Sequence, residues 1–202
     1  MLGSIGPAAL VILAINIGIG IAGLGRDPRV IDACVFRPYE FARGRRRFTL
    51  LASGFAHADL PHLLFNMITF FFFGVPMERV LGTPMFVLLY ALGLALSPLI
   101  SLARHRNNPS YATLGASGAV SAVLFAFVVY FPTAPMIIFP IPLPIPAWLF
   151  AAGYLAYSIW ASRSHAGRIN HDAHLAGALT GVAFVAVTDP RAVVSLLRYL
   201  GL

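Results

Sequence analysis

A serine lies between glycines at the start of a long apolar run, in the stretch Leu114-Gly115-Ala116-Ser117-Gly118. In such a run a serine more often packs helices together, or bonds back to its own helix, than acts as a nucleophile. Its hydroxyl attacks a carbonyl group only when a neighbouring base takes its proton. The packing interpretation therefore stays open until the rest of the chain offers such a base.

Three further polar residues in apolar runs have the types that acyl transfer uses. His174 is the candidate base, because neutral imidazole, with a pKa of about 6.5, both accepts and returns a proton. His62 and Asn66 are four residues apart, so on a helix they share a face. Together with the backbone N–H of Ser117 they are candidate donors to an oxyanion. Considered alone, His62 and Asn66 are equally well explained as polar residues that hydrogen-bond one helix to another.

No acid stands where a catalytic triad needs one. Asp172 is two positions before His174 and would lie on a different face of a helix, so the pattern predicts a Ser117/His174 dyad. There is no His-Glu-x-x-His pattern and no acid beside the histidines of the apolar runs to complete a zinc site. The lone Cys34 excludes an internal disulfide and a multi-cysteine metal site. We therefore expect neither a metal nor a cofactor.

The composition is that of a membrane protein. The 202 residues are 59% hydrophobic and 10% charged, with a mean hydropathy of +0.83, which is too apolar for a soluble globule. All fourteen basic residues are arginine, against seven acids, and they lie mostly in loops, which suits anionic lipid headgroups better than nucleic acid. The run Leu2 to Leu24 has no positive segment before it, so we expect a retained span.

Six apolar runs of roughly twenty residues each predict six transmembrane helices within a single membrane domain, residues 1–202. The prolines between residues 132 and 146 cannot lie inside one helix, so a loop or hairpin is expected there. The long connection 25–59 is mixed in character and is expected to lie in the membrane interface. The expected spans are 4–24, 60–76, 84–102, 112–131, 147–162 and 171–187.

These spans place His62, Ser117 and His174 near the same face of the membrane, each at the start of its helix. Small residues predict that the fourth and sixth helices approach closely. They are Gly118, Ala122 and Ala126 on the fourth, and Gly177 and Gly181 on the sixth. Gly115 is expected to let the backbone approach a substrate.

The motifs together resemble those of the rhomboid intramembrane serine proteases. Gly115-Ala116-Ser117-Gly118 looks like their Gly-x-Ser-Gly, and His174-Leu175-Ala176-Gly177 looks like the histidine segment of their sixth helix. His62-x-x-x-Asn66 is similar to their second-helix motif. Residues 47–66 are similar to their first-loop exit, and residues 78–82 resemble the turn after their second helix. The resemblance covers the six-helix core.

The resemblance implies an all-α membrane protein, a six-transmembrane-helix bundle with a long interfacial first loop. It also implies a water-accessible cavity with Ser117 as nucleophile, His174 as general base, and His62 and Asn66 at the oxyanion. Substrates would be transmembrane segments of other proteins within the lipid bilayer. Such a segment must unwind before attack, because a helix hides its carbonyls in internal hydrogen bonds. The fifth span is a candidate lateral gate, with aromatic residues Trp148, Phe150, Tyr154, Tyr157 and Trp160.

Two features depart from the family's pattern. Family members often carry an aromatic residue one turn after the nucleophile, stacked on the base, and this chain has Ser121 there. The orientation of His174 is therefore expected to depend on another group.

Eleven of the fourteen arginines follow the first, third and fifth spans, which by charge alone would place the catalytic side in the cytoplasm. We adopt the opposite, family orientation and expect a multi-pass protein of a bacterial inner membrane.

Two other function classes are alternatives to an intramembrane serine endopeptidase. A non-catalytic rhomboid-like protein would bind or remodel membrane clients, but such homologues usually lack the serine or the histidine, and this chain keeps both. A transporter finds little support, because no paired broken helices or buried ion-coordinating acids are visible.

Of the other histidines, His57 is expected to support the site, whereas no chemistry is assigned to His105, His165 and His171. Glu78 and Arg79 are expected to brace the turn that follows.

Overall fold

The computed structural model describes residues 5–138, 141–164 and 170–201, which are mostly helical. Six helices correspond to the six expected apolar runs, and shorter elements connect or follow them. The long helices are α1 (Pro7–Gly25), α5 (Leu60–Leu81), α6 (Thr83–His105), α7 (Ser117–Tyr130), α8 (Ala147–Ser164) and α9 (His171–Thr188). The shorter elements are α2 (Pro28–Cys34), α3 (Pro38–Phe41), α4 (Thr49–Ala52), the 3-10 turn η1 (Ser53–Phe55), strands β1 (Pro135–Ile138) and β2 (Ile141–Pro146), and α10 (Pro190–Tyr199).

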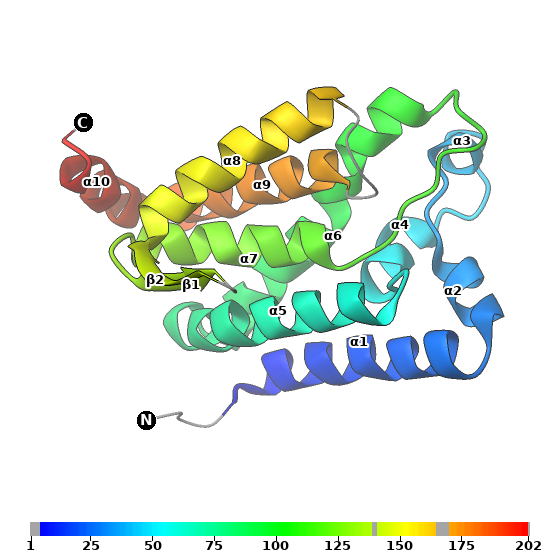
Figure 1. Cartoon of the computed structure of the whole chain (residues 1–202), viewed down its shortest axis with the longest axis horizontal. Helices are drawn as coiled ribbons and strands as arrows, with labels where there is room; N and C mark the ends of the chain where they lie inside the picture. The colour runs from blue at the N-terminus through cyan, green and yellow to red at the C-terminus, as the bar shows by residue number, and fades with distance from the viewer. Residues whose placement is uncertain (1–4, 139–140, 165–169, 202) are drawn as a thin grey trace.

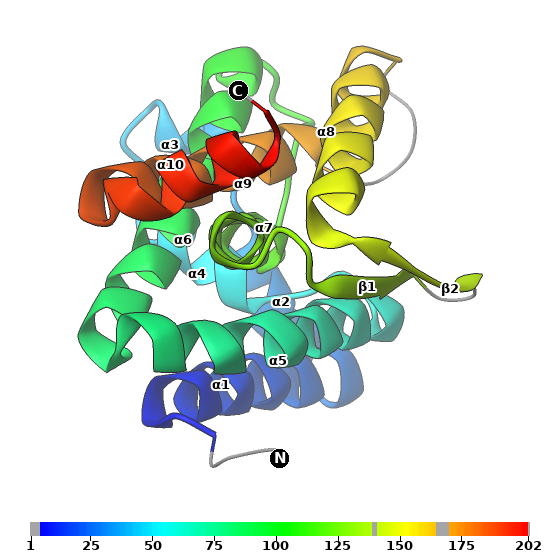
Figure 2. The same cartoon turned by 90° about the vertical axis from the view of Figure 1, so that its left-hand side faces the viewer.

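Helix α7 is the centre of the bundle. Seen end-on in Figure 2, it is surrounded by α5, α6, α9 and the hairpin, with α1 outside α5. Eleven of its fourteen residues are buried, which is why its sequence is apolar on every side rather than on one face. In Figure 1, α5, α7 and α9 each begin at their right-hand end and run toward the left. The first turns that carry His62, Ser117 and His174 therefore lie at one end of the bundle.

Local signals fix where these three helices begin. The carboxylate of Asp59 accepts a hydrogen bond from the backbone N–H of His62 (2.8 Å), which caps α5. The side chain of Asn170 accepts one from the N–H of Ala173 (3.1 Å) and caps α9 in the same way. Helix α7 has no side-chain cap and follows Gly115, whose φ of +124° is one that only glycine adopts readily.

Two of the expected helix ends are wrong. The fourth helix begins at Ser117 and not at Ala112, because Thr113 exchanges two backbone hydrogen bonds (3.0 Å each) with Phe36 and Gly115 has a non-helical φ. The second continues beyond Pro76 to Leu81. A proline costs a helix one backbone hydrogen bond, and helices in membranes tolerate that loss. The other ends agree to within three residues, except that Ser4 lies outside the described residues.

Within the described residues, α1, α5 and α6 are long and apolar enough to cross a membrane. Helix α9 joins α10 at a bend of 112°, and the pair makes a fourth candidate if counted as one span. Helix α7 is apolar but has only 14 residues. The protein is therefore an integral membrane protein, while a count of six spans stays a prediction.

The proline-rich break is a hairpin. Strands β1 and β2 pair antiparallel with Pro135 opposite Pro146, and the register shifts between Met136 and Ile138. The prolines that exclude a helix here are compatible with a two-stranded sheet, in which each strand is an edge. The hairpin connects the end of α7 to the start of α8 (Figure 2).

The connection between α1 and α5 folds into the short helices α2, α3 and α4 and the turn η1. Phe36 is fully buried, and Pro38 is buried with it. The Arg46 guanidinium donates hydrogen bonds to the backbone carbonyls of Asp32 and Ala33, so this basic residue holds the connection together. The connection thus packs against the helices as expected, and its place in the membrane interface stays a prediction.

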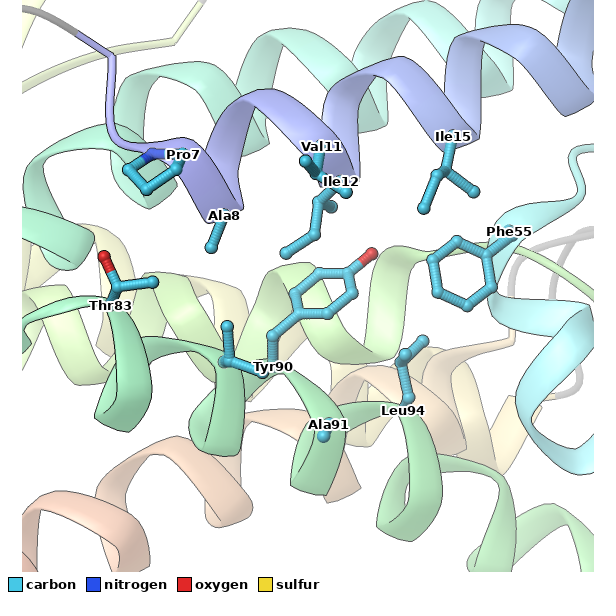
Figure 3. Close-up of a pocket in the computed structure, with 11 residues that line it drawn as sticks. Pro7, Ala8, Val11, Ile12, Ile15, Phe55, Thr83, Tyr90, Ala91 and Leu94 are labelled. Atoms are coloured by element: carbon cyan, nitrogen blue, oxygen red, sulfur yellow. The ribbon is translucent and has the colours of Figure 1, made fainter.

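An apolar cavity of about 450 Å³ lies between α1 and α6, with Phe55 at one end (Figure 3). The ring of Tyr90 rises from α6 toward α1 across it. None of His62, Asn66, Ser117 and His174 lines this cavity, so it is distinct from the candidate site.

Candidate active site

Ser117 is the first residue of α7 and is partly accessible, whereas the nine residues that follow it are all buried. The backbone N–H of Gly115 donates a hydrogen bond to the carbonyl oxygen of Ser53 (2.8 Å), which ties the segment before α7 to η1. A Cβ at Gly115 would come within 2.7–2.8 Å of the His62 imidazole. Glycine at 115 therefore allows both the turn into α7 and the approach of the His62 ring to it.

His62 and Asn66 lie one turn apart on α5, as their spacing predicts. The Asn66 Nδ2 donates a hydrogen bond to the backbone carbonyl of His62 (3.0 Å), and the Asn66 side chain is buried. One of its two N–H bonds is thus used within α5, and its predicted role at an oxyanion would fall to the second. His57 packs edge-on against His62, with ring centroids 5.1 Å apart at 78°.

His174 lies in the first turn of α9 between two other rings. The Tyr154 ring of α8 is stacked on it, with centroids 6.0 Å apart and planes 19° from parallel. His171 meets it edge-on at 5.8 Å and 75°. Tyr157, one turn beyond Tyr154, contacts His171 in turn at 5.3 Å and 83°. Two tyrosines three residues apart on α8 therefore face two histidines three residues apart on α9.

Helices α7 and α9 are in backbone contact, as their small residues predict. A Cβ at Gly177 would overlap the carbonyl oxygen of Gly118, and one at Gly181 would overlap the carbonyl oxygen of Ala122, one turn further along. A Cβ at Gly118 would lie 3.3 Å from the carbonyl oxygen of Ala173 and would overlap the Ser97 hydroxyl of α6. The residues next to Ser117 and His174 in sequence thus touch each other.

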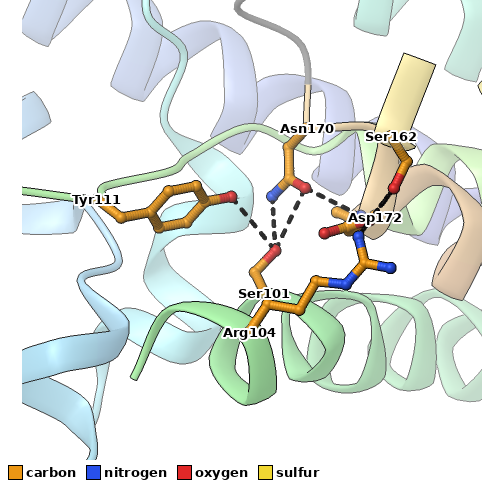
Figure 4. A network of polar contacts seen from close by, with 7 residues as sticks. Ser101, Arg104, Tyr111, Ser162, Asn170 and Asp172 are labelled. Carbon is orange, nitrogen blue, oxygen red and sulfur yellow. Dashed lines mark hydrogen bonds and ion pairs between the residues drawn. The ribbon is translucent and has the colours of Figure 1, made fainter. Parts of the chain in front are cut away.

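A polar network fastens the ends of α6, α8 and α9 beside this contact (Figure 4). The Asp172 carboxylate accepts hydrogen bonds from Arg104 and Ser162, each at 2.6 Å. The Asn170 amide donates to the hydroxyls of Ser101 (2.9 Å) and Thr113 (3.0 Å). Asp172 is thus engaged with Arg104 and Ser162, and the Ser117/His174 dyad stays a prediction.

The structure brings together at one end of the bundle the elements of all four predicted site residues, Ser117, His174, His62 and Asn66. Their roles in a reaction stay predictions. Tyr154 is the neighbour of His174 that sequence reasoning assigned to a gate instead. The sequence did contain a signal for this contact, because Tyr154 and Tyr157 have the same spacing as His171 and His174. Only the packing of α8 on α9 shows that the two pairs meet.

Known proteins match this chain over most of its length. Residues 44–191 match the model of the Rhomboid domain. Rhomboid protein 1, mitochondrial, of Saccharomyces cerevisiae is 28% identical over 187 residues, which cover 88% of this chain and 53% of the yeast protein. Presenilin-associated rhomboid-like protein, mitochondrial, of Rattus norvegicus is 34% identical over 147 residues, which cover 67% of this chain and 37% of the rat protein.

RHOMBOID-like protein 12, mitochondrial, of Arabidopsis thaliana is similar at 30% identity over 148 residues, 66% of this chain and 44% of that protein. The chain thus spans about half or less of the length of these relatives. All three are named as mitochondrial proteins of eukaryotes, which disagrees with the expected bacterial inner membrane. The domain match covers most of the chain, including all four site residues, and this chain belongs to the rhomboid family.

Proposed function

We propose that this protein is an intramembrane serine endopeptidase that cleaves transmembrane segments of other membrane proteins. The observation that carries the proposal is the backbone contact between the first turns of α7 and α9. Because even a Cβ added at Gly118 would lie 3.3 Å from the Ala173 carbonyl oxygen, the helix starts that bear Ser117 and His174 are adjacent. Two residues from runs more than fifty positions apart would not otherwise combine into one reactive pair.

The proposed reaction is acyl transfer in two steps. His174 takes the proton of the Ser117 hydroxyl as Oγ attacks the carbonyl carbon of the scissile peptide bond. The oxyanion accepts hydrogen bonds from the Ser117 N–H, the His62 ring and the Asn66 amide. Collapse of this intermediate breaks the C–N bond, and the leaving amine takes the proton from His174. A water molecule then gives a proton to His174 as its oxygen attacks the acyl carbon. The bond between that carbon and the Ser117 Oγ breaks, Oγ takes the proton back from His174, and the carboxylic acid is released.

The position of the residues along their helices supports a site open to water. Ser117, His62 and His174 are each partly accessible, and each lies in the first turn of its helix at the same end of the bundle (Figure 1). Hydrolysis needs water at the acyl-enzyme, and a helix end is where a membrane-embedded site can obtain it. The substrate class that the rhomboid resemblance implies is compatible with this place: a transmembrane segment whose backbone unwinds near the membrane face.

A serine-directed fluorophosphonate tests the proposal. We expect the purified full chain to be labelled, Ser117→Ala to lose labelling, and His174→Ala to be labelled on the order of a hundredfold more slowly, because the hydroxyl then lacks its base. Equal labelling of wild type and Ser117→Ala would defeat the assignment. Co-expression with single-span membrane proteins, comparing wild type with Ser117→Ala, then identifies cleaved substrates.

The alternative is a non-catalytic rhomboid-like protein that binds or remodels membrane clients. The finding that would favour it is client capture by wild type and Ser117→Ala alike, with no labelling and no cleavage by either. The presence of both Ser117 and His174, on helices in backbone contact, favours the endopeptidase.

A further inference from the structure

We infer that Tyr154 is a positioning residue for His174, and that Ser121 holds Tyr154 in place. The inference rests on the proposed function and names what orients its general base. Three helices contribute: Ser121 comes from α7, Tyr154 from α8 and His174 from α9. Ser121, one turn after Ser117, thus keeps a role at the site, because its side chain supports the Tyr154 ring of another helix.

The contacts run in one line from Ser121 to the base. The Ser121 Oγ and the Tyr154 hydroxyl are 3.1 Å apart, within hydrogen-bond distance. Ser121 is buried, and a Cβ at Gly177 would come within 3.1 Å of its Cβ, so the serine is enclosed between α7 and α9. The Tyr154 ring is in turn stacked on the His174 ring, and the two ring planes lie 19° from parallel.

A base in a dyad needs this kind of support. In a triad, the acid holds the imidazole in the orientation at which it can take the proton of the serine. In this chain Asp172, the acid nearest to His174 in sequence, accepts hydrogen bonds from Arg104 and Ser162. A ring stacked on the imidazole restricts rotation about its χ2 angle, and the bond to Ser121 fixes the far end of that ring. His171, edge-on to His174, limits the imidazole from a second side.

The competing reading is that Tyr154 only fills space. Its ring also lies 5.7 Å from Phe125 and 5.8 Å from Phe150, so removing it would loosen the packing between α7 and α8. The two readings differ in what they predict for the rate of reaction of folded protein. The amount of folded, reactive protein is given by the fluorophosphonate labelling at completion. The rate constant of labelling reports how well His174 is held.

The test compares Tyr154→Leu, Tyr154→Phe, Ser121→Ala and the double variant with wild type, in the full chain. We expect Tyr154→Leu to lower the rate constant at least tenfold, with labelling at completion unchanged. Tyr154→Phe keeps the ring and should lower it only two- to threefold, as should Ser121→Ala. The double variant Tyr154→Phe/Ser121→Ala should be no slower than Tyr154→Phe or Ser121→Ala alone, because both changes remove the same hydrogen bond. With a cleaved substrate, the loss should fall on kcat and leave KM unchanged.

Three results would overturn the inference. They are a wild-type rate constant for Tyr154→Leu, a Tyr154→Phe as slow as Tyr154→Leu, and a loss in Tyr154→Leu that lies wholly in the labelling at completion. The first two contradict a role for the ring, and the third shows that the residue only supports folding. Failure of the proposed function is distinguishable, because wild type and Ser117→Ala would then be labelled alike.

Discussion

At the scale of single residues, His57 shows how the surroundings of a side chain change its chemistry. The side chain is fully buried, and neither ring nitrogen has a hydrogen-bond partner among the described residues. Burial, with a smaller contribution from His62, lowers the pKa of His57 to about 4. His57 is thus neutral at physiological pH and lies against His62 as a packing partner. The supporting role expected of it at the site stays a prediction.

This pKa predicts how stability depends on pH. In the unfolded chain His57 has a pKa of about 6.5, so as the pH falls the unfolded state takes up a proton first. The stability that neutral His57 contributes is complete above about pH 6.5 and is lost as the pH falls toward 4, by up to about 1.4 kcal/mol per pH unit. This loss of stability is measured by the melting temperature of the detergent-solubilised protein between pH 7.5 and 4.5.

The matched variant for this experiment is His57→Gln, which keeps a polar side chain of similar size but does not titrate. Its melting temperature should fall less steeply with decreasing pH than that of wild type. Parallel curves for the two proteins would show that His57 is not the titrating group.

At the scale of elements, the contact of α7 with α9 decides whether two helix starts become a site. The two glycines of α9, Gly177 and Gly181, face carbonyl oxygens that are one turn apart on α7, so no side chain separates the backbones. A close approach of this kind gains van der Waals contact along the whole interface. It also fixes the relative height of the two helices, which a looser interface of large side chains would not do.

Gly177→Ala tests this contact. The added methyl group overlaps the Gly118 carbonyl, so α9 must move away from α7, and we expect a loss of about 1–3 kcal/mol in stability. The fluorophosphonate labelling rate should fall at least tenfold, because His174 moves with α9. The control is Gly153→Ala on α8, where a Cβ meets nothing within 4 Å. It should leave the rate unchanged and the stability equal or slightly higher. Equal effects of the two substitutions would contradict the argument.

At the scale of the whole molecule, a single carboxylate joins three helices at the end opposite the site. Glu78 of α5 is buried and accepts hydrogen bonds from the backbone N–H groups of Ala8 (3.0 Å) and Ala9 (2.7 Å). It also accepts one from the Thr83 hydroxyl of α6 (2.8 Å). The expected brace at this turn therefore reaches further than predicted, since Glu78 caps α1, whose own N-cap Gly6 has no side chain.

Glu78→Ala should accordingly destabilise the whole bundle. It leaves two buried N–H groups of α1 without an acceptor, at a cost of about 2 kcal/mol or more. We expect a lower melting temperature in detergent and faster proteolysis near the start of α1. Glu78→Gln keeps an oxygen acceptor and should lie between Glu78→Ala and wild type. A melting temperature of Glu78→Ala equal to that of wild type would show that the cap does not contribute to stability.

The helical runs and the candidate residues were predictable from the sequence because their signals are local. Hydropathy marks each apolar run, Asp59 and Asn170 cap α5 and α9, and the prolines of 132–146 exclude a helix. The start of α7 was misplaced for the opposite reason. Residues 112–116 are as apolar as a helix would be, and only pairing with Phe36, far away in sequence, makes Thr113 extended.

What the sequence determined by itself is the set of chemical types, serine, histidines and asparagine, and the small residues that allow helices to meet. The tertiary structure alone decided which side chains surround His174. A residue one turn after Ser117 can be identified from spacing, but Tyr154 is more than thirty residues away, and stacking depends on the angle at which α8 packs. Side-chain periodicity reports one helix at a time, whereas the surroundings of the His174 ring are set by contacts between helices.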